Sequence, residues 1–169
     1  MARVVVIGLG NPILSDDGVG LAVVREARPH LEGLPVEVVE ACVGGLGLLD
    51  LLAGHERAVL VDAVVTGRAQ PGEVLELDAG FLEDTSHLGT AGVSHQVDLA
   101  TAWQLGRRLG LSLPVRLRIF GVEAADVKTF SESLTPAVRA RLGQAVEAVV
   151  AAVREELDGG DPGCTNSVS

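Results

Sequence analysis

Aromatic residues are almost missing from this sequence. They make up 2% of the 169 residues, as three Phe and one Trp, and Tyr is absent. A hydrophobic core must therefore come from Val, Leu, Ala and Ile, which supply most of the 47% hydrophobic content. Such a core is typical of parallel strands that are covered by helices on both faces. The length fits a single domain that can bury a sizeable core.

Three further shortages limit what the chain is expected to bind. Basic residues number 13 against 23 acidic ones, and the net charge of −10 would repel a nucleic-acid backbone. No apolar run reaches the roughly 18 to 20 residues that span a bilayer, so no membrane partner is expected. Cys42 and Cys164 are the only cysteines and lie far apart, which predicts no disulfide framework and favours the reducing cytoplasm.

Short β-branched runs alternate with longer helical patterns along the chain. Residues 3–9 predict a buried strand, because a continuous Val and Ile run ends in the turn residues Gly10, Asn11 and Pro12. Further strands are predicted at residues 35–41, 57–63, 72–78 and 115–121. Helices are predicted at residues 16–31, in a Leu-rich segment that ends at residue 52, at 94–109 and from 135 to 157.

This alternation predicts an α/β fold, a three-layer α/β/α sandwich with a mostly parallel five-stranded sheet. Residues 72–78 predict an edge strand that can run antiparallel. We expect one domain over residues 1–157 and a disordered tail over 158–169, which is rich in Gly, Ser and Asp. Residues 79–93 predict a long surface loop of the kind that often carries function.

Three segments with acidic or histidine side chains are expected at one edge of this sheet. Asp16 and Asp17 follow the first strand, Asp62 ends the third, and His95 begins a helix behind a glycine-rich loop. Ligands of open α/β sheets gather beyond the carboxyl ends of the strands. A carboxylate that ends a buried apolar strand needs a partner for its charge. Two carboxylates and an imidazole could bind a divalent ion such as nickel or zinc, weakly and with an open coordination position.

Each of these residues also has a structural interpretation. Asp16 could cap the first helix, and Asp17 could complement the dipole of that helix. Asp62 could bind the amides of the next loop, and His95 could be an exposed residue at a helix start. His30, His55 and His87 are expected on the surface or in loops.

Two other kinds of site are weaker alternatives. The segment Gly8-Leu9-Gly10 after a strand, with Glu40 at the end of the second strand, partly fits a dinucleotide-binding fingerprint. Ile13 occupies the third glycine position, however, and the aspartates at 16 and 17 would repel a pyrophosphate. Cys42 could act as a nucleophile with His95, but a lone buried Cys is more often a small hydrophobic residue.

Residues 8–20 form a long and specific motif, GLGNPILSDDGVG. Four later segments accompany it: LVDA at 60–63, Ser94-His95 with Leu99, FGVE at 120–123, and LTP at 134–136. Together these segments resemble the hydrogenase maturation endopeptidases, which process the large subunit of nickel-iron hydrogenases. The resemblance covers residues 3 to about 155.

The resemblance implies an activity, a partner and a site. The chain would cleave the C-terminal extension of a nickel-loaded hydrogenase large-subunit precursor, with no organic cofactor. The sequence leaves the oligomeric state open, and a monomer is favoured. Residues at the positions of Asp17, Asp62 and His95 bind a metal in that family, and the nickel would be supplied by the precursor. A metal held there would polarise the scissile carbonyl or activate a water, and Asp16 or Glu40 could accept the proton.

One departure from the family pattern concerns the segment after the second strand. Family members often carry Asp-Gly-Gly-Thr there, whereas Val43 precedes and Leu46 follows Gly44-Gly45 in this chain. Glu40 is the nearest acid that could take the missing position. A different class of function, a non-catalytic nickel-checkpoint or chaperone module that binds the same precursor, is the alternative to a peptidase.

Overall fold

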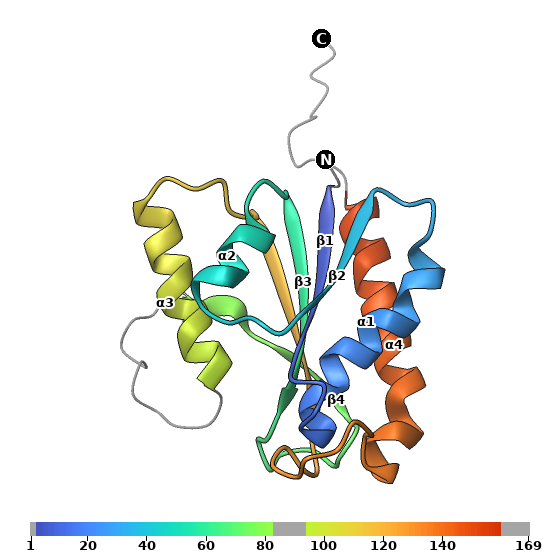
Figure 1. The fold of residues 1–169 in the computed structure, drawn as a ribbon. Helices are drawn as coiled ribbons and strands as arrows, with labels where there is room; N and C mark the ends of the chain where they lie inside the picture. The colour runs from blue at the N-terminus through green and yellow to red at the C-terminus, as the bar shows by residue number, and fades with distance from the viewer. Residues whose placement is uncertain (1–2, 83–93, 160–169) are drawn as a thin grey trace.

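The protein forms a five-stranded sheet with helices on both faces (Figure 1). The computed structural model describes the backbone of residues 3–82 and 94–159, and the side chains of residues 3–80 and 99–159. The strand order is β2-β1-β3-β5-β4. The four parallel strands are β1 (Val4–Leu9), β2 (Val36–Ala41), β3 (Arg57–Val64) and β5 (Arg116–Glu123).

Edge strand β4 (Val74–Leu77) runs antiparallel to β5, with Val74 opposite Val122 and Leu77 opposite Ile119. The predicted fold class, including the antiparallel edge, is therefore confirmed. Strand β2 forms the other edge of the sheet. Both edge strands are only partly buried. The central strands β1 and β3 are buried along their whole length, in keeping with the apolar runs at 4–9 and 58–61.

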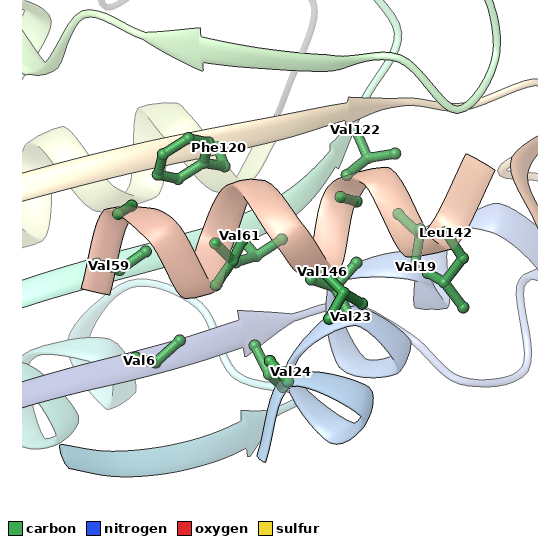
Figure 2. Close-up of a cluster of buried hydrophobic side chains, with 14 of the residues drawn as sticks. Val6, Val19, Val23, Val24, Val59, Val61, Phe120, Val122, Leu142 and Val146 are labelled. Carbon is green, nitrogen blue, oxygen red and sulfur yellow. The ribbon is translucent and has the colours of Figure 1, made fainter. Parts of the chain in front are cut away.

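Successive side chains of each strand point to opposite faces, so the sheet separates two cores. Val6 and Val61 belong to the core under α1 (Val19–Ala27) and α4 (Pro136–Asp158). Figure 2 shows Leu142 and Val146 of α4 lying over this core. Ile7 and Leu60 belong to the other core, which also holds Trp103 and is covered by α2 (Leu46–Leu52) and α3 (Ser94–Arg108).

The predicted helix at 16–31 consists of three pieces in the structure. A 3-10 turn at Ser15–Gly18 precedes α1, and a second one at Arg28–Leu31 follows it. In the predicted loop at 79–93, Ala79–Leu82 form another 3-10 turn, whereas residues 83–93 lie outside the described part of the chain. The predicted disordered tail lies outside it as well, from residue 160 onward. Among the described helices, none combines the length and apolarity of a membrane span.

The amino ends of the strands bury polar groups that the sequence did not single out. His55, expected on the surface or in a loop, lies in the loop before β3 but is 7% exposed, and its Nε2 lies 3.0 Å from Oε2 of Glu37. Arg57 is 5% exposed and donates to the backbone carbonyls of Glu156 and Gly159 at the end of α4. The Arg57 contacts tie the end of α4 to the amino end of β3, and the His55 contact ties the loop before β3 to β2.

Two glycines of the opening signature let α1 pack directly on the sheet. A Cβ at Gly20 would lie 2.3 Å from the carbonyl oxygen of Leu9 and 2.5 Å from that of Val61. A Cβ at Gly8 would lie 2.3 Å from the carbonyl oxygen of Gly20. The helix backbone therefore touches the backbones of β1 and β3, and it holds the preceding turn against the carboxyl edge of the sheet.

We predict that Gly20→Ala lowers the free energy of unfolding by about 2 kcal/mol or more, because the added methyl meets backbone atoms that cannot move aside. Chemical denaturation measures this change. Gly143→Ala is the matched control, since a Cβ there meets nothing within 4 Å on an exposed part of α4. That variant should gain about 0.5–1 kcal/mol from helix propensity. Equal stability of Gly20→Ala and the wild type would disprove the backbone contact.

Candidate active site

Asp17 lies on an open cleft beyond the carboxyl end of β1. The cleft has a volume of about 440 Å³, and its other lining residues come from the loops after β1, β2 and β5: Gly10, Asn11, Leu14, Cys42, Val43 and Val127. The Asp17 side chain is half-buried, and its Oδ2 accepts a hydrogen bond from the backbone N–H of Asn11 at 3.1 Å. This one bond orients the carboxylate and leaves it lining the cleft.

The neighbouring Asp16 has a different environment, with no exposed surface. Its Oδ2 accepts hydrogen bonds from the backbone N–H groups of Ala125 and Asp126, at 2.9 and 3.1 Å. The backbone N–H of Thr135 donates to Oδ1 at 2.7 Å, and the Thr135 hydroxyl lies 2.8 Å from Oδ2. The carboxylate is thus surrounded by donors from the loop between β5 and α4.

Backbone hydrogen bonds join the same two segments. The N–H of Ser15 donates to the carbonyl of Ser131 at 2.8 Å, and the N–H of Ser131 donates to the carbonyl of Ile13 at 3.0 Å. Asp16 also donates its own N–H to the carbonyl of Asp126 at 2.9 Å. Figure 1 shows the loop after β5 beside the segment after β1 at the lower end of the sheet. The loop between β5 and α4 therefore holds the turn that carries Asp17 in place.

These contacts give Asp16 a structural role. It makes no side-chain cap to the 3-10 turn or to α1, so the interpretation as a cap of its own helix is wrong. It instead binds the residue that precedes α4. A buried carboxylate that accepts four different donors is poorly suited to collect a proton from a substrate water, which weighs against Asp16 as the general base.

Asp62 lies on β3, two residues before the end of the strand. It is 6% exposed, and its Oδ1 accepts a hydrogen bond from the N–H of Ala63 at 2.8 Å. Its side chain points to the face of the sheet that α2 and α3 cover, where it shares a narrow cavity of about 20 Å³ with Leu60, Leu99 and Ile119. A carboxylate among such side chains gains strongly from a nearby cation or donor.

His95 is the second residue of α3, as expected, but its side chain lies outside the described part of the structure. Helix α3 begins on the carboxyl side of the sheet (Figure 1). Leu99, one turn later, lines the same cavity as Asp62. Asp17, Asp62 and the start of α3 thus lie at one edge of the sheet. Among the side chains that are described, no three His, Cys, Asp or Glu residues form a group that could hold a metal ion.

Two residues near the second strand differ from expectation. Glu40 lies on the α1 face of the sheet, opposite the face of Asp62, and its Oε2 lies 2.5 Å from Nη2 of Arg25. It therefore does not replace the acid that the segment at 43–46 lacks. Cys42 is exposed and lines the cleft beside Asp17, so the interpretation as a buried hydrophobic residue is wrong.

Glu123 was not singled out as a functional residue by sequence. It is 3% exposed at the end of β5 and accepts hydrogen bonds from the N–H groups of Thr66 and Gly67, both at 2.9 Å. The Thr66 hydroxyl donates to it at 2.7 Å. Glu123 thus fixes the turn after the strand that carries Asp62. The sequence contains a signal that could have identified Glu123. Like Asp62, it is an acidic residue at the carboxyl end of a buried apolar strand, where its charge needs a partner.

Comparison with known proteins gives a consistent result. A family model described as hydrogenase maturation protease matches residues 21–152. The hydrogenase 2 maturation protease of Escherichia coli K12 is 33% identical over 156 residues, which cover 90% of this chain and 92% of that protein. The hydrogenase expression/formation protein HupD of Rhodobacter capsulatus is 30% identical over 157 residues, covering 90% of this chain and 70% of that protein.

Solved structures agree with these sequence matches. The hydrogenase maturating endopeptidase HybD of E. coli superposes with a TM-score of 0.77 at 29% identity, over 91% of this chain and 93% of that one. The [NiFe] hydrogenase maturation protease HybD of Thermococcus kodakarensis gives a TM-score of 0.64 at 25% identity, over 92% and 98%.

We predict that Asp16→Ala lowers the free energy of unfolding by about 3 kcal/mol, because several donors lose their acceptor and each costs about 1–3 kcal/mol where water cannot replace it. Urea denaturation measures this loss. Asp78→Ala serves as control, since Asp78 is exposed and, within the described part of the chain, accepts one hydrogen bond, from Gly80 at 2.9 Å. If both variants lose the same small amount, Asp16 does not hold the two loops together.

Proposed function

Because this chain belongs to the hydrogenase maturation protease family, we propose that it removes the C-terminal extension of a nickel-loaded hydrogenase large-subunit precursor. The observation that carries this proposal is the position of the acidic residues of the family motifs. Asp17 lines an open cleft that a peptide can enter, and Asp62 lies on the adjacent strand at the same edge of the sheet.

We infer that Asp17, Asp62 and His95 together contact the nickel of the precursor. His95 lies in α3 one turn before Leu99, and Leu99 lines the cavity of Asp62. Two carboxylates and one imidazole leave coordination positions open for ligands of the precursor. Such a set suits transient recognition of an ion that another protein carries. Nickel is thus treated as part of the substrate.

The roles of the chain's own residues follow from their surroundings. A divalent ion at this place polarises a carbonyl or lowers the pKa of a bound water. Asp17 is the carboxylate on the cleft, oriented by the N–H of Asn11. Asp16 and Glu123 hold the two turns behind the site. Family membership favours a peptidase over a non-catalytic checkpoint module. Action in the cytoplasm and as a monomer stay predictions.

The proposal predicts that Asp17→Asn, Asp62→Asn and His95→Ala each reduce cleavage of the nickel-loaded precursor at least about a hundredfold, because removing an ion contact costs several kcal/mol in the transition state. Mass spectrometry of the precursor measures the loss of its C-terminal extension. Asp50→Asn, which changes an exposed carboxylate on α2, should cleave at the wild-type rate. Full cleavage by both Asp62→Asn and His95→Ala would refute the assignment of the site.

Nickel removal gives an independent prediction. A precursor prepared without nickel should keep its extension in the presence of the wild-type protein, because the three residues then have no ion to contact. Adding back nickel to the precursor during its preparation should restore cleavage. If the wild type binds the loaded precursor but leaves its mass unchanged, the protein is a checkpoint module and not the peptidase.

A further inference from the structure

Phe130 is an unusual residue for this chain. It is one of only four aromatic residues, yet it is 82% exposed, whereas Phe120 and Trp103 are buried in the two cores. Ile13, on the segment hydrogen-bonded to the loop of Phe130, is 47% exposed. Exposed single apolar residues are common, but aromatic residues dominate the energetics of protein contacts.

The loop that presents Phe130 is held in place on both sides. Asp126 accepts hydrogen bonds from the backbone N–H groups of Lys128 and Thr129, at 2.9 and 3.0 Å. Bonds from Thr129 and Lys128 also hold the pKa of Asp126 below its usual range. Ser131 pairs with the segment of Ile13 and Ser15 through its backbone. The exposed ring therefore sits on a preformed scaffold, which reduces the entropy that binding must overcome.

The same loop continues into the cleft of Asp17. Val127, three residues before Phe130, and Leu14, next to Ile13, both line that cleft. Val43, from the loop after β2, also lines the cleft and is 45% exposed. The two segments that carry Phe130 and Ile13 thus each supply an apolar residue to the cleft where the proposed chemistry occurs.

We propose that Phe130 and Ile13 form a docking contact for the precursor protein, beside the segment that enters the cleft. This inference rests on the proposed function. The occupant is an apolar surface of the folded precursor. Together the two side chains can bury only on the order of 200–300 Å², against about 800 Å² per partner in a stable dimer. So small a contact suits a substrate that must be released after cleavage, and it does not suffice for a second copy of this chain.

The experiment compares Phe130→Ala and Phe130→Asp with Val115→Ala. Val115 is also 82% exposed, but it lies just before β5, at the opposite edge of the sheet. We expect the Phe130 variants to raise both the Kd and the KM for the nickel-loaded precursor about tenfold or more, while kcat stays at the wild-type value. Val115→Ala should change none of these constants. All three variants should keep the wild-type Tm, because the side chains are exposed.

The Kd, from calorimetry with full-length precursor, and the cleavage rate are measured separately. If the wild type fails to cleave, the proposed function falls, and the Kd still decides the docking contact. An unchanged Kd in both Phe130 variants overturns the inference. So does an equal effect of Val115→Ala. If sedimentation instead shows that Phe130→Ala abolishes self-association and the Kd is unchanged, a second copy is the occupant and the precursor is not.

Discussion

The buried carboxylate of Asp16 holds together the loops at the carboxyl ends of the strands. It joins the turn after β1 to the loop after β5 and to the residue before α4, through donors that lie 109 to 119 positions away in the sequence. A carboxylate without solvent contact is stable only if its oxygens are fully hydrogen-bonded, and here they are. The position of Asp17 depends on this arrangement, because it is the next residue in the chain.

Two adjacent acidic residues therefore have different surroundings, one buried and one on the cleft. Asp16 points into the protein and Asp17 lines the cleft, and the difference arises from the short 3-10 turn that carries both. Glu123, at the end of the neighbouring strand β5, is a second buried carboxylate that holds a loop. It fixes the turn after β3, the strand that carries Asp62. Gly8 and Gly20 also position this turn. They permit close contact between the backbone of α1 and the sheet, and this contact fixes the distance between the sheet and the turn that precedes α1.

The sequence predicted most of the fold, because the apolar periods of strands and helices depend on local chain geometry. The runs in β1 and β3 read as buried parallel strands, and the rule for their carboxyl ends brought Asp17, Asp62 and the start of α3 to one edge. The sequence did not predict hydrogen-bond partners that lie far apart in the chain. Neither the donors to Asp16 nor the contact of His55 with Glu37 can be read from local patterns. Glu40 was misjudged because nearness in the chain was taken for nearness in space, although alternate strand residues face opposite sides.

The long reach of the Asp16 contacts also has a meaning for biosynthesis. Residues 125–135 are made well after the turn that they anchor, and α4 follows them in the chain. A nascent polypeptide that has completed only the first three strands possesses the acidic motif but not the brace behind it. The edge of the sheet that carries Asp17 and Asp62 can therefore receive this support only when translation is nearly finished.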